Sequence, residues 1–470
     1  MRPVNTTQLV RGLTLVAAVS IVVGNVIGTG VFLKARVMTC NVGTPLMVLL
    51  VYFGAGLLSL AGALTYAELA AMKPRAGGEY VFLRDAYGKV WAFLYGWMSF
   101  FIGKAGSQAA LGIGFAIFLN DLLRGMLSGE YFSVNILGYQ FPFGKLQIVA
   151  LAAIAIVTLI NCAAVRVSGH VAAVLTGVKI ALVLFVGIGA FLLAQGADWS
   201  HFAMANTAGT CEGVAETARS GLAGFGAAML GALWAYDGWN NVTLVAGEVK
   251  DPQRNLPLAL IGGMLLITGL YIFVNFAYFY ALSPTEVASV SAASSVATEV
   301  ARTFLGPLAI GLIAAALLSS TFGTLHTSIL TGARVPYAMA QDGLFFKKLS
   351  KVSPRTHVPI GALIAQAIWA GILTLSGSFD ALTDYAIFGL WIFYALATAS
   401  VFVFRKRMPD AERPYRAWGY PVVPILFLIV AGMLLLNTVW TTPRQALAGI
   451  ALILLGLPVY WYWTRRDVAG

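Results

Sequence analysis

The chain has 470 residues, of which 59% are hydrophobic and only 10% are charged. Soluble domains average roughly 45–50% apolar and about 25% charged residues, so this composition excludes a soluble fold. The net charge of +11 does not indicate nucleic-acid binding, because the basic residues are scattered through short loops instead of gathering on one face. We therefore expect a protein embedded in the lipid bilayer, with no nucleic-acid partner.

Continuous apolar runs recur along the chain, and each is long enough to cross roughly 30 Å of hydrocarbon as a helix. A membrane β-barrel would instead show short stretches of alternating polarity. The sequence predicts an all-α integral membrane protein with 12 transmembrane helices. The predicted spans are Leu13–Leu33, Leu46–Ala71, Val90–Leu119, Leu146–Ala164, Val171–Ala194, Leu222–Val249, Leu258–Leu282, Leu305–Ala340, Ile360–Leu375, Ala381–Phe404, Val422–Val439 and Ala446–Trp463.

The distribution of basic residues predicts the orientation of these spans. An even number of spans puts both chain ends on the same side of the membrane. Most of the 30 lysines and arginines lie in the two tails and in the loops after even-numbered spans. Such loops are cytoplasmic by the positive-inside rule. We expect a multi-pass protein of the plasma or inner membrane with both termini in the cytoplasm.

Cysteine usage and motif content argue against several chemistries. The three cysteines, Cys40, Cys162 and Cys211, predict no disulfide framework, although one bridge between Cys40 and Cys211 stays open. No spacing typical of a zinc site, a nucleotide-binding loop or a nucleophile elbow occurs. We therefore expect no enzyme, no cofactor and no metal. A membrane enzyme or a non-transporting sensor remains the alternative from another class.

Two of the predicted spans carry polar interruptions. Val23–Phe32 places three glycines and two polar residues in the middle of the first span, and Tyr236–Asn241 places a carboxylate, a glycine and two amides in the sixth. Within a bilayer, broken backbone is tolerated only where it is buried in protein or lines a wet cavity. Gly24 and Gly28 alone would also fit a helix-packing face. Because a polar interruption recurs in the sixth span, five spans after the first, the sequence favours a 5+5 inverted repeat in which broken helices 1 and 6 face each other.

The interrupted backbone predicts a binding site for a zwitterion. Free N–H groups at Gly28, Thr29 and Gly30 would lie at the positive end of a half-helix, which favours a carboxylate. Carbonyl groups released beside the two breaks can accept hydrogen bonds from an ammonium group. These carbonyls belong to Val26, Ile27, Trp234 and Ala235.

Four segments carry a resemblance to a known family: Gly24–Phe32, Trp234–Asn240, Glu248–Pro257 and Arg334–Ala340. They resemble the amino acid–polyamine–organocation (APC) superfamily and, within it, bacterial relatives of the L-type amino acid transporters. The resemblance covers essentially the whole chain and implies alternating access with the LeuT-like fold. It implies one transporter domain over 1–470, with a five-helix repeat over 13–196, its inverted copy over 222–405 and two further helices over 421–464.

The resemblance also assigns roles to individual residues. It implies that Gly28, Thr29 and Gly30 hold the substrate carboxylate, whereas carbonyls of Val26 or Ile27 and of Trp234 hold the ammonium group. The Trp234 ring matches an aromatic gate over the substrate, and core packing is the alternative. Asn240 resembles a polar residue that braces the unwound sixth span.

Two lysines and an aspartate lie inside predicted spans, where each charge needs a partner or a purpose. Lys179 resembles the lysine that replaces a sodium ion in sodium-independent members, and snorkelling and proton coupling are its alternatives. Asp237 resembles the aspartate of exchangers that take neutral and dibasic amino acids, and capping of the restarting helix is equally open. Lys104 is followed by Ala105–Ser107 where the family has Pro-Ser, so no role is carried over to it.

Two other polar residues have structural interpretations. Glu68 is expected to form a salt bridge near the cytoplasmic end of the second span. His326 is expected to be a hydrogen-bonded histidine between helices. The segment Met72–Lys89 is expected to form either a short amphipathic helix at the membrane interface or a solvated loop.

These observations predict a sodium-independent secondary transporter of amino acids, either an exchanger or a proton-coupled carrier, with neutral L-amino acids as its main substrates. A cationic amino acid or polyamine antiporter is the alternative. The family's eukaryotic members join a glycoprotein through a cysteine between the third and fourth spans. Residues 121–144 contain no cysteine, so no covalent heavy-chain partner is expected. The sequence does not decide the oligomeric state, and a monomer is one option.

Overall fold

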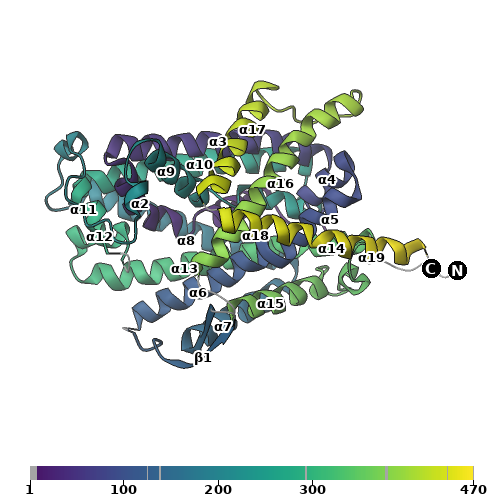
Figure 1. Cartoon of the computed structure of the whole chain (residues 1–470), viewed down its shortest axis with the longest axis horizontal. Helices are drawn as coiled ribbons and strands as arrows, with labels where there is room; N and C mark the ends of the chain where they lie inside the picture. Colours follow the sequence, from purple (N-terminus) through teal and green to yellow (C-terminus); the bar gives the residue numbers. More distant parts are fainter. Residues whose placement is uncertain are drawn as a thin grey trace.

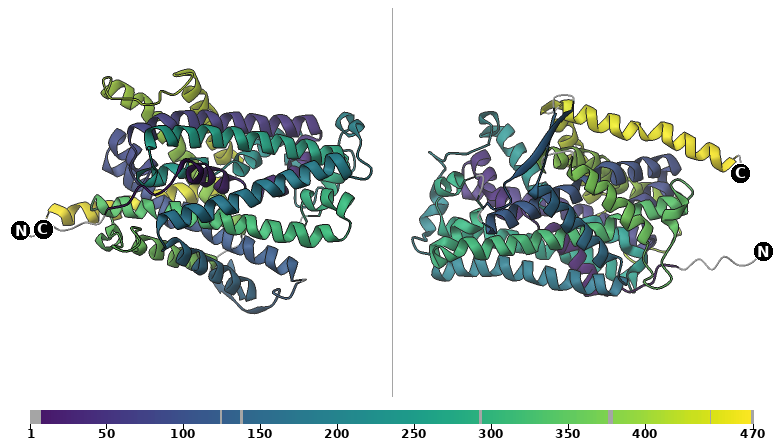
Figure 2. Two further views of the ribbon diagram at one scale, coloured as in Figure 1. Left: turned by 180° about the vertical axis from the view of Figure 1, so that it is seen from behind. Right: turned by 90° about the horizontal axis from the view of Figure 1, so that it is seen from below.

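The computed structural model describes residues 8–123, 125–136, 139–291, 294–375, 379–441 and 443–468. This part of the chain is a bundle of helices with one two-stranded sheet, and the long helices run roughly along the longest axis of the molecule (Figures 1 and 2). Nine helical stretches in this part are long and apolar enough to cross a membrane, and some of them, such as Leu15–Val42, are made of consecutive helices. Lys145–Asn161 and Ile360–Thr374 are shorter apolar helices. The chain is therefore a multi-pass helical membrane protein.

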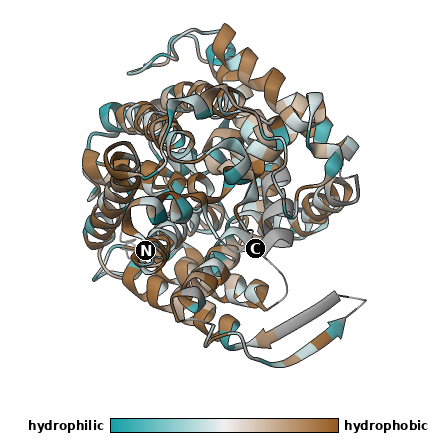
Figure 3. Cartoon of the chain, turned by 90° about the vertical axis from the view of Figure 1, so that its left-hand side faces the viewer, coloured by the Kyte–Doolittle hydropathy of each residue, from teal (hydrophilic) through white to brown (hydrophobic). Residues whose placement is uncertain are grey.

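The first part of the chain supplies eight helices and the sheet. The helices are α1 (Leu15–Val26), α2 (Gly30–Val42), α3 (Pro45–Met72), α4 (Glu79–Tyr87), α5 (Lys89–Met98), α6 (Lys104–Leu122), α7 (Lys145–Asn161) and α8 (Val165–Leu193). A π-helical turn, Ser99–Gly103, joins α5 to α6. Strands β1 (Glu130–Ile136) and β2 (Tyr139–Gly144) pair antiparallel as a hairpin that projects from the bundle (Figure 3).

The second part begins with two 3₁₀ turns, Trp199–Ala203 and Glu216–Ala218. Its longer elements are α9 (Gly221–Ala235), the 3₁₀ helix η4 (Trp239–Glu248), α10 (Pro252–Ala281), α11 (Pro284–Ser289), α12 (Val296–Leu305), α13 (Leu308–Gly332), α14 (Arg334–Gln341), the 3₁₀ turn Lys347–Ser350, α15 (Ile360–Thr374), α16 (Phe379–Arg407), α17 (Val422–Thr441), α18 (Pro443–Leu454) and α19 (Gly456–Val468).

Several boundaries differ from the predicted spans. Helix α2 continues past the predicted end at Leu33 to Val42, because its polar residues find partners: Arg36 donates to the Glu212 carbonyl at 2.6 Å and Thr39 to the Ala35 carbonyl at 2.7 Å. The prediction also missed the hairpin and the short helices α11 and α12, which lack the apolar length of a span.

The segment Met72–Lys89 contains the short helix α4, so the alternative of a solvated loop is wrong. In α4, Tyr80, Val81, Phe82 and Glu79 are buried, whereas the charged groups of Arg84 and Asp85 stay partly exposed. The pattern of aromatic and charged residues predicted an amphipathic helix, but only the tertiary structure shows that protein covers its apolar face.

Large apolar side chains remain exposed on the outward faces of the long helices, among them Leu50 on α3, Val174 on α8 and Leu265 on α10. Apolar residues predominate on the peripheral helices when the bundle is viewed end-on (Figure 3). Large exposed apolar surfaces of this kind indicate that a membrane or a partner protein, and not water, contacts them. They agree with the nine helical stretches that are long enough to span a membrane.

Buried ion pairs tie helices together at the end of the bundle where α4 and α14 lie (Figure 1). Glu68 binds Arg405 at 2.7 Å and Arg413 at 3.4 Å, so its predicted salt bridge is confirmed. Arg334 binds Glu248 at 2.7 Å with both side chains fully buried. Buried pairs leave a costly unpaired charge when one partner is removed.

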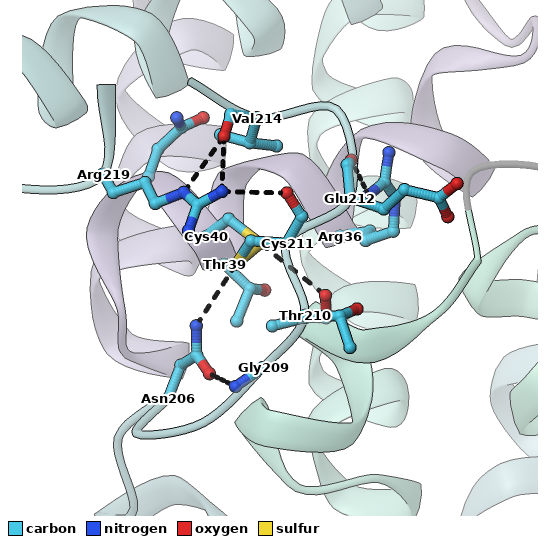
Figure 4. Close-up of a disulfide and its surroundings, with 12 residues drawn as sticks. Arg36, Thr39, Cys40, Asn206, Gly209, Thr210, Cys211, Glu212, Val214 and Arg219 are labelled. Carbon is cyan, nitrogen blue, oxygen red and sulfur yellow. Dashed lines mark hydrogen bonds between the residues drawn. A yellow bond between two sulfur atoms is a disulfide. The ribbon is translucent and has the colours of Figure 1, made fainter. Parts of the chain in front are cut away.

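A disulfide joins Cys40, at the end of α2, to Cys211, in the loop between α8 and α9 (Figure 4). The bridge that the sequence left open is therefore present. The loop around it is held by further bonds: Asn206 N–H donates to the Gly43 carbonyl at 2.8 Å, and Arg219 donates to the Val214 carbonyl at 2.7 Å. We call this end of the molecule, opposite α14 and α19, the disulfide end (Figure 1).

Replacing both cysteines with serine should lower the free energy of unfolding by about 2–4 kcal/mol, because the bridge closes a long loop in the unfolded chain. Thermal unfolding of detergent-solubilised protein by differential scanning fluorimetry measures the change. Cys162→Ser is the matched control, since Cys162 forms no disulfide. Equal melting temperatures for the double variant and the parent protein would contradict the prediction.

Candidate functional site

The first break separates α1 from α2. Helix α1 ends at Val26, and the Gly28 N–H donates back to the Val26 carbonyl at 2.8 Å instead of continuing the helix. Thr29 is the N-cap residue of α2. Among the described residues, the backbone N–H groups of Thr29, Gly30 and Val31 have no acceptor. Three donors and the positive end of a helix therefore point into the same small region.

The second break separates α9 from η4. Helix α9 ends at Ala235, and Gly238 then adopts a φ of +98°, in the left-handed region where glycine is favoured. The chain restarts as a 3₁₀ helix at Trp239 instead of the α-helix that the prediction assumed. Both spans are thus interrupted at the positions that the sequence predicts.

The two breaks lie directly against each other. A Cβ atom added to Gly30 would lie 2.7 Å from Ala235 Cβ and 2.8 Å from Ala235 Cα, which leaves no room for a side chain. A Cβ atom on Gly238 would lie 3.0 Å from Asn25 Cβ. Glycine is needed at both points because backbone from one break approaches the other at contact distance.

The carbonyl groups at the breaks already accept hydrogen bonds within the protein. The Tyr271 hydroxyl on α10 lies 3.0 Å from both the Val26 and the Ala235 carbonyl oxygens, so it bridges the two breaks. Ser320 on α13 donates to the Ile27 carbonyl at 3.2 Å. The Trp234 carbonyl accepts the Asp237 N–H at 3.1 Å. A carbonyl oxygen has two lone pairs, so the Ile27 and Ala235 oxygens can accept one more donor, whereas the Val26 oxygen already accepts both the Gly28 N–H and the Tyr271 hydroxyl.

Lys179 lies where α1, α8 and α13 meet, and it is buried with 1% of its surface exposed. Its ammonium group donates to the Gly24 carbonyl at 2.6 Å and to the Thr324 hydroxyl at 2.7 Å. A snorkelling lysine would extend toward the membrane surface. The contacts instead fix its charge beside the last turn of α1.

Asp237 is half-buried and accepts a hydrogen bond from the Tyr394 hydroxyl at 3.1 Å. The 3₁₀ helix η4 has Gly238 as its cap, and the Asp237 carboxylate interacts with the Gly238 backbone N–H, so capping of the restarting helix stays a prediction for Asp237. Trp234 is also half-buried, and the Lys34 ammonium lies 4.8 Å from its ring centroid. These two side chains flank the second break.

The amides after the second break reach two buried charged residues. The Asn240 side chain donates to the carboxylate of Glu79, so it connects η4 to α4. The backbone carbonyl of Asn240 accepts a hydrogen bond from the Thr243 hydroxyl at 2.8 Å. Lys104 on α6 donates to the side-chain carbonyl of Asn241. The geometry thus fits the bracing role that the resemblance implies for Asn240.

Sequence reasoning missed Tyr271, Ser320, Thr324, Tyr394 and Glu79 as partners of the breaks. The only sequence signal was a polar residue within or near an apolar span, which does not reveal its contacts. The expectation for His326 is wrong: the residue is fully buried, yet neither ring nitrogen has a hydrogen-bond partner in the described part of the chain. Its backbone carbonyl accepts the bond from Asn161 instead.

A membrane-spanning bundle whose two interrupted helices meet in its interior is typical of transporters built on discontinuous helices. The model of the amino acid permease family matches residues 13–461. The chain therefore belongs to the amino acid permease family of the APC superfamily, whose members are transporters and not enzymes.

Curated relatives are similar over nearly the whole chain. The serine/threonine exchanger SteT of Bacillus subtilis is 33% identical over 98% of both chains. The human b(0,+)-type amino acid transporter 1 is 32% identical over 98% of this chain and 89% of its own length. The mouse large neutral amino acids transporter small subunit 2 is 30% identical over 97% and 82%, respectively. The chain is therefore an amino acid transporter.

Proposed function

We propose that this transporter exchanges neutral L-amino acids across the plasma or inner membrane by alternating access, independently of sodium. The observation that carries the proposal is the contact between the two helix breaks, which puts three free N–H groups beside a set of carbonyl oxygens. Thr29 and Gly30 hold the substrate carboxylate with their free N–H groups. The Gly28 N–H, predicted to be free, instead donates to the Val26 carbonyl at 2.8 Å, so Gly28 joins this site only by exchanging that bond for one to the carboxylate. The carbonyls of Val26, Ile27, Trp234 and Ala235 hold the ammonium group, and Tyr271 yields its bonds when the substrate enters.

Lys179 stands in for a coupling cation in this proposal. Its ammonium group lies between the first, fifth and eighth spans and, within the described ranges, donates to two neutral oxygen atoms, as a sodium ion at that place would be bound. A fixed positive charge beside the break supports transport without sodium. Proton coupling through the same lysine is the alternative.

The proposed topology has 12 spans in one domain, with an inverted repeat over 13–196 and 222–405 and two further helices over 421–464. Both termini are cytoplasmic. The disulfide supports this orientation independently of the basic loops, because disulfides form in oxidising compartments and are rare in the cytosol. The disulfide end then faces outward, and α14 and α19 lie on the cytoplasmic side.

The proposed substrates follow from the site and from the relatives' names. SteT is named as an exchanger of serine and threonine, which supports small neutral substrates and exchange. The half-buried carboxylate of Asp237 favours cationic amino acids as a second class, since it can receive a cationic side chain. A carrier of cationic amino acids or polyamines is thus the alternative proposal.

Purified protein in proteoliposomes tests the proposed function. We expect uptake of labelled serine to require an internal amino acid and to continue when choline replaces sodium. Competition by the 20 standard amino acids and by common polyamines then gives the substrate class. Strict dependence on sodium would contradict the role of Lys179, and uptake without internal substrate would contradict exchange.

Asp237→Asn should weaken competition by arginine and lysine about tenfold while serine uptake continues, because the change removes the charge and keeps the shape. Inhibition constants of arginine against labelled serine measure the effect. Asp198→Asn is the control, since Asp198 caps an exposed 3₁₀ turn. Unchanged arginine inhibition, relative to serine, would mean that Asp237 does not contact the substrate side chain.

A further inference from the structure

The face of α2 that follows the first break carries a lysine beside the tryptophan of the second break. Helices α2 and α9 lie side by side (Figure 1). Gly30 and Lys34 are four residues apart, so they share one face of α2, about 6 Å apart along its axis. The Trp234 ring packs against this face: a Cβ atom added to Gly30 would lie 3.4 Å from Trp234 Cζ3, and the Lys34 ammonium lies 4.8 Å from the ring centroid.

The stem of Lys34 passes α9 at a residue that has no side chain. A Cβ atom added to Gly231 would lie 3.9 Å from Lys34 Cδ, and Gly231 is three residues before Trp234. The stem therefore packs beside α9, and its ammonium group ends over the ring. A cation over the face of an indole ring is attracted by the ring's electron density. This contact fixes where the charge of Lys34 lies.

The groups at the start of α2 are all electrically positive. The N-terminal end is the positive end of the helix dipole, and the first turn contains no acidic residue. The N–H groups of Thr29, Gly30 and Val31 have no acceptor among the described residues. Lys34 adds a full positive charge one turn farther along. Since lysine is favoured at the opposite end of a helix, the stability of α2 does not account for its position.

Lys34 and Trp234 are both half-buried, so part of each side chain faces out of the packed interior. An ionised group directed at hydrocarbon is costly, so we expect the exposed part of Lys34 to face water. From Lys34, helix α2 continues to Cys40 at the disulfide end, which faces outward in the proposed topology. Lys34 then lies between the outer solution and the first break.

We propose that Lys34 selects substrates by charge at the outer entrance of the transport site. Its ammonium group attracts the carboxylate of an arriving amino acid toward the N–H groups of Thr29 and Gly30, and it repels a cationic side chain. Neutral amino acids are therefore favoured over dibasic ones from the outer side. This inference rests on the proposed function and names the substrate class that the outer entrance selects. Asp237 has the opposite preference, so the two residues act against each other.

Lys34→Met removes the charge, whereas its unbranched apolar side chain can still pack against Gly231 and the ring. In whole cells, which present the outer face, the KM of serine uptake should rise about tenfold, with the maximal rate within about a factor of two. Arginine loses the same attraction but also the repulsion of its side chain, so its inhibition constant should stay about the same. In inside-out membrane vesicles, which present the cytoplasmic face, both constants should equal those of the parent protein.

Two further variants separate charge from packing. Lys34→Arg keeps a cation over the ring and should keep the parent constants. Lys145→Gln removes an exposed lysine at the start of α7, on the same proposed side, and should also leave them unchanged. Equal constants in Lys34→Met and the parent protein would overturn the inference. So would a rise in the KM of serine that Lys34→Arg shows as well, because the side chain would then act through its shape.

The salt dependence of uptake tests the inference without any variant. Raising choline chloride from about 0.01 to about 0.15 M at constant osmolarity shortens the Debye length from about 30 to about 8 Å. The KM of serine at the outer face of the parent protein should rise about twofold, whereas that of Lys34→Met should not change. A parent KM that is independent of salt would overturn the inference even if the variants do not fold.

The outcomes also separate this inference from the function on which it rests. Serine exchange with the same constants in Lys34→Met and the parent protein would defeat only the role of Lys34. A parent protein that is folded by size-exclusion chromatography but exchanges no amino acid would defeat the proposed function itself.

Discussion

Gly30→Ala is expected to lower amino acid exchange about 100-fold, as a displacement of binding groups by about 1 Å does. The new methyl group would lie 2.8 Å from the Ala235 Cα, which belongs to the backbone of the second break and cannot rotate away. The two breaks must therefore move apart, and the N–H groups at the start of α2 move with them. Initial rates of labelled serine uptake measure the loss.

Gly226→Ala on α9 is the matched control, because a Cβ atom there would meet nothing within 4 Å. It should transport like the parent protein. Melting temperature and chromatographic profile show whether Gly30→Ala still folds. Uptake by folded Gly30→Ala within a factor of two of the control would show that the breaks tolerate separation, in conflict with the proposed site.

Lys179→Gln is expected to reduce exchange about 100-fold, because the variant loses two hydrogen bonds from a charged donor, each contributing about 1.5–3 kcal/mol. The bonds hold the Gly24 carbonyl, in the last turn before the first break, to Thr324 on α13. Without them the position of that turn is set by the weaker bond from Thr324 to Gly24, at 3.3 Å. Serine uptake and substrate-induced thermal stabilisation measure the effect.

The control for this change is Lys347→Gln, which removes an exposed lysine from the cytoplasmic side of the proposed topology. It should leave uptake unchanged. If Lys179→Gln transports as well as this control, the ammonium group does not hold the first break, and the proposed reason for sodium independence is lost.

The breaks show what local sequence can predict. Gly24–Gly30 and Asp237–Asn241 concentrate glycine and polar residues inside apolar runs, and those residues disfavour a continuous lipid-facing helix wherever they occur. Their position could therefore be predicted before their surroundings were known. The type of helix after the second break could not be predicted, because the 3₁₀ geometry of η4 depends on how η4 packs against its neighbours.

The partners of the breaks could not be predicted in the same way. Tyr271 is 245 residues from Val26 along the chain, and nothing in its local sequence distinguishes it from other tyrosines of the spans. Glu79 lies in the segment Met72–Lys89, whose pattern predicts an amphipathic helix or a solvated loop and gives no buried partner for a carboxylate. Its contact with Asn240 depends on how α4 packs under the bundle.

The sequence by itself determined the membrane class, the apolar spans and the two interruptions, since these follow from composition and from the solvation of backbone within lipid. Only the tertiary structure decided that Cys40 and Cys211 are bridged and that Lys104 donates to Asn241. Such pairings join residues from distant segments. They are set by how the helices pack, because that packing alone brings the groups within bonding distance.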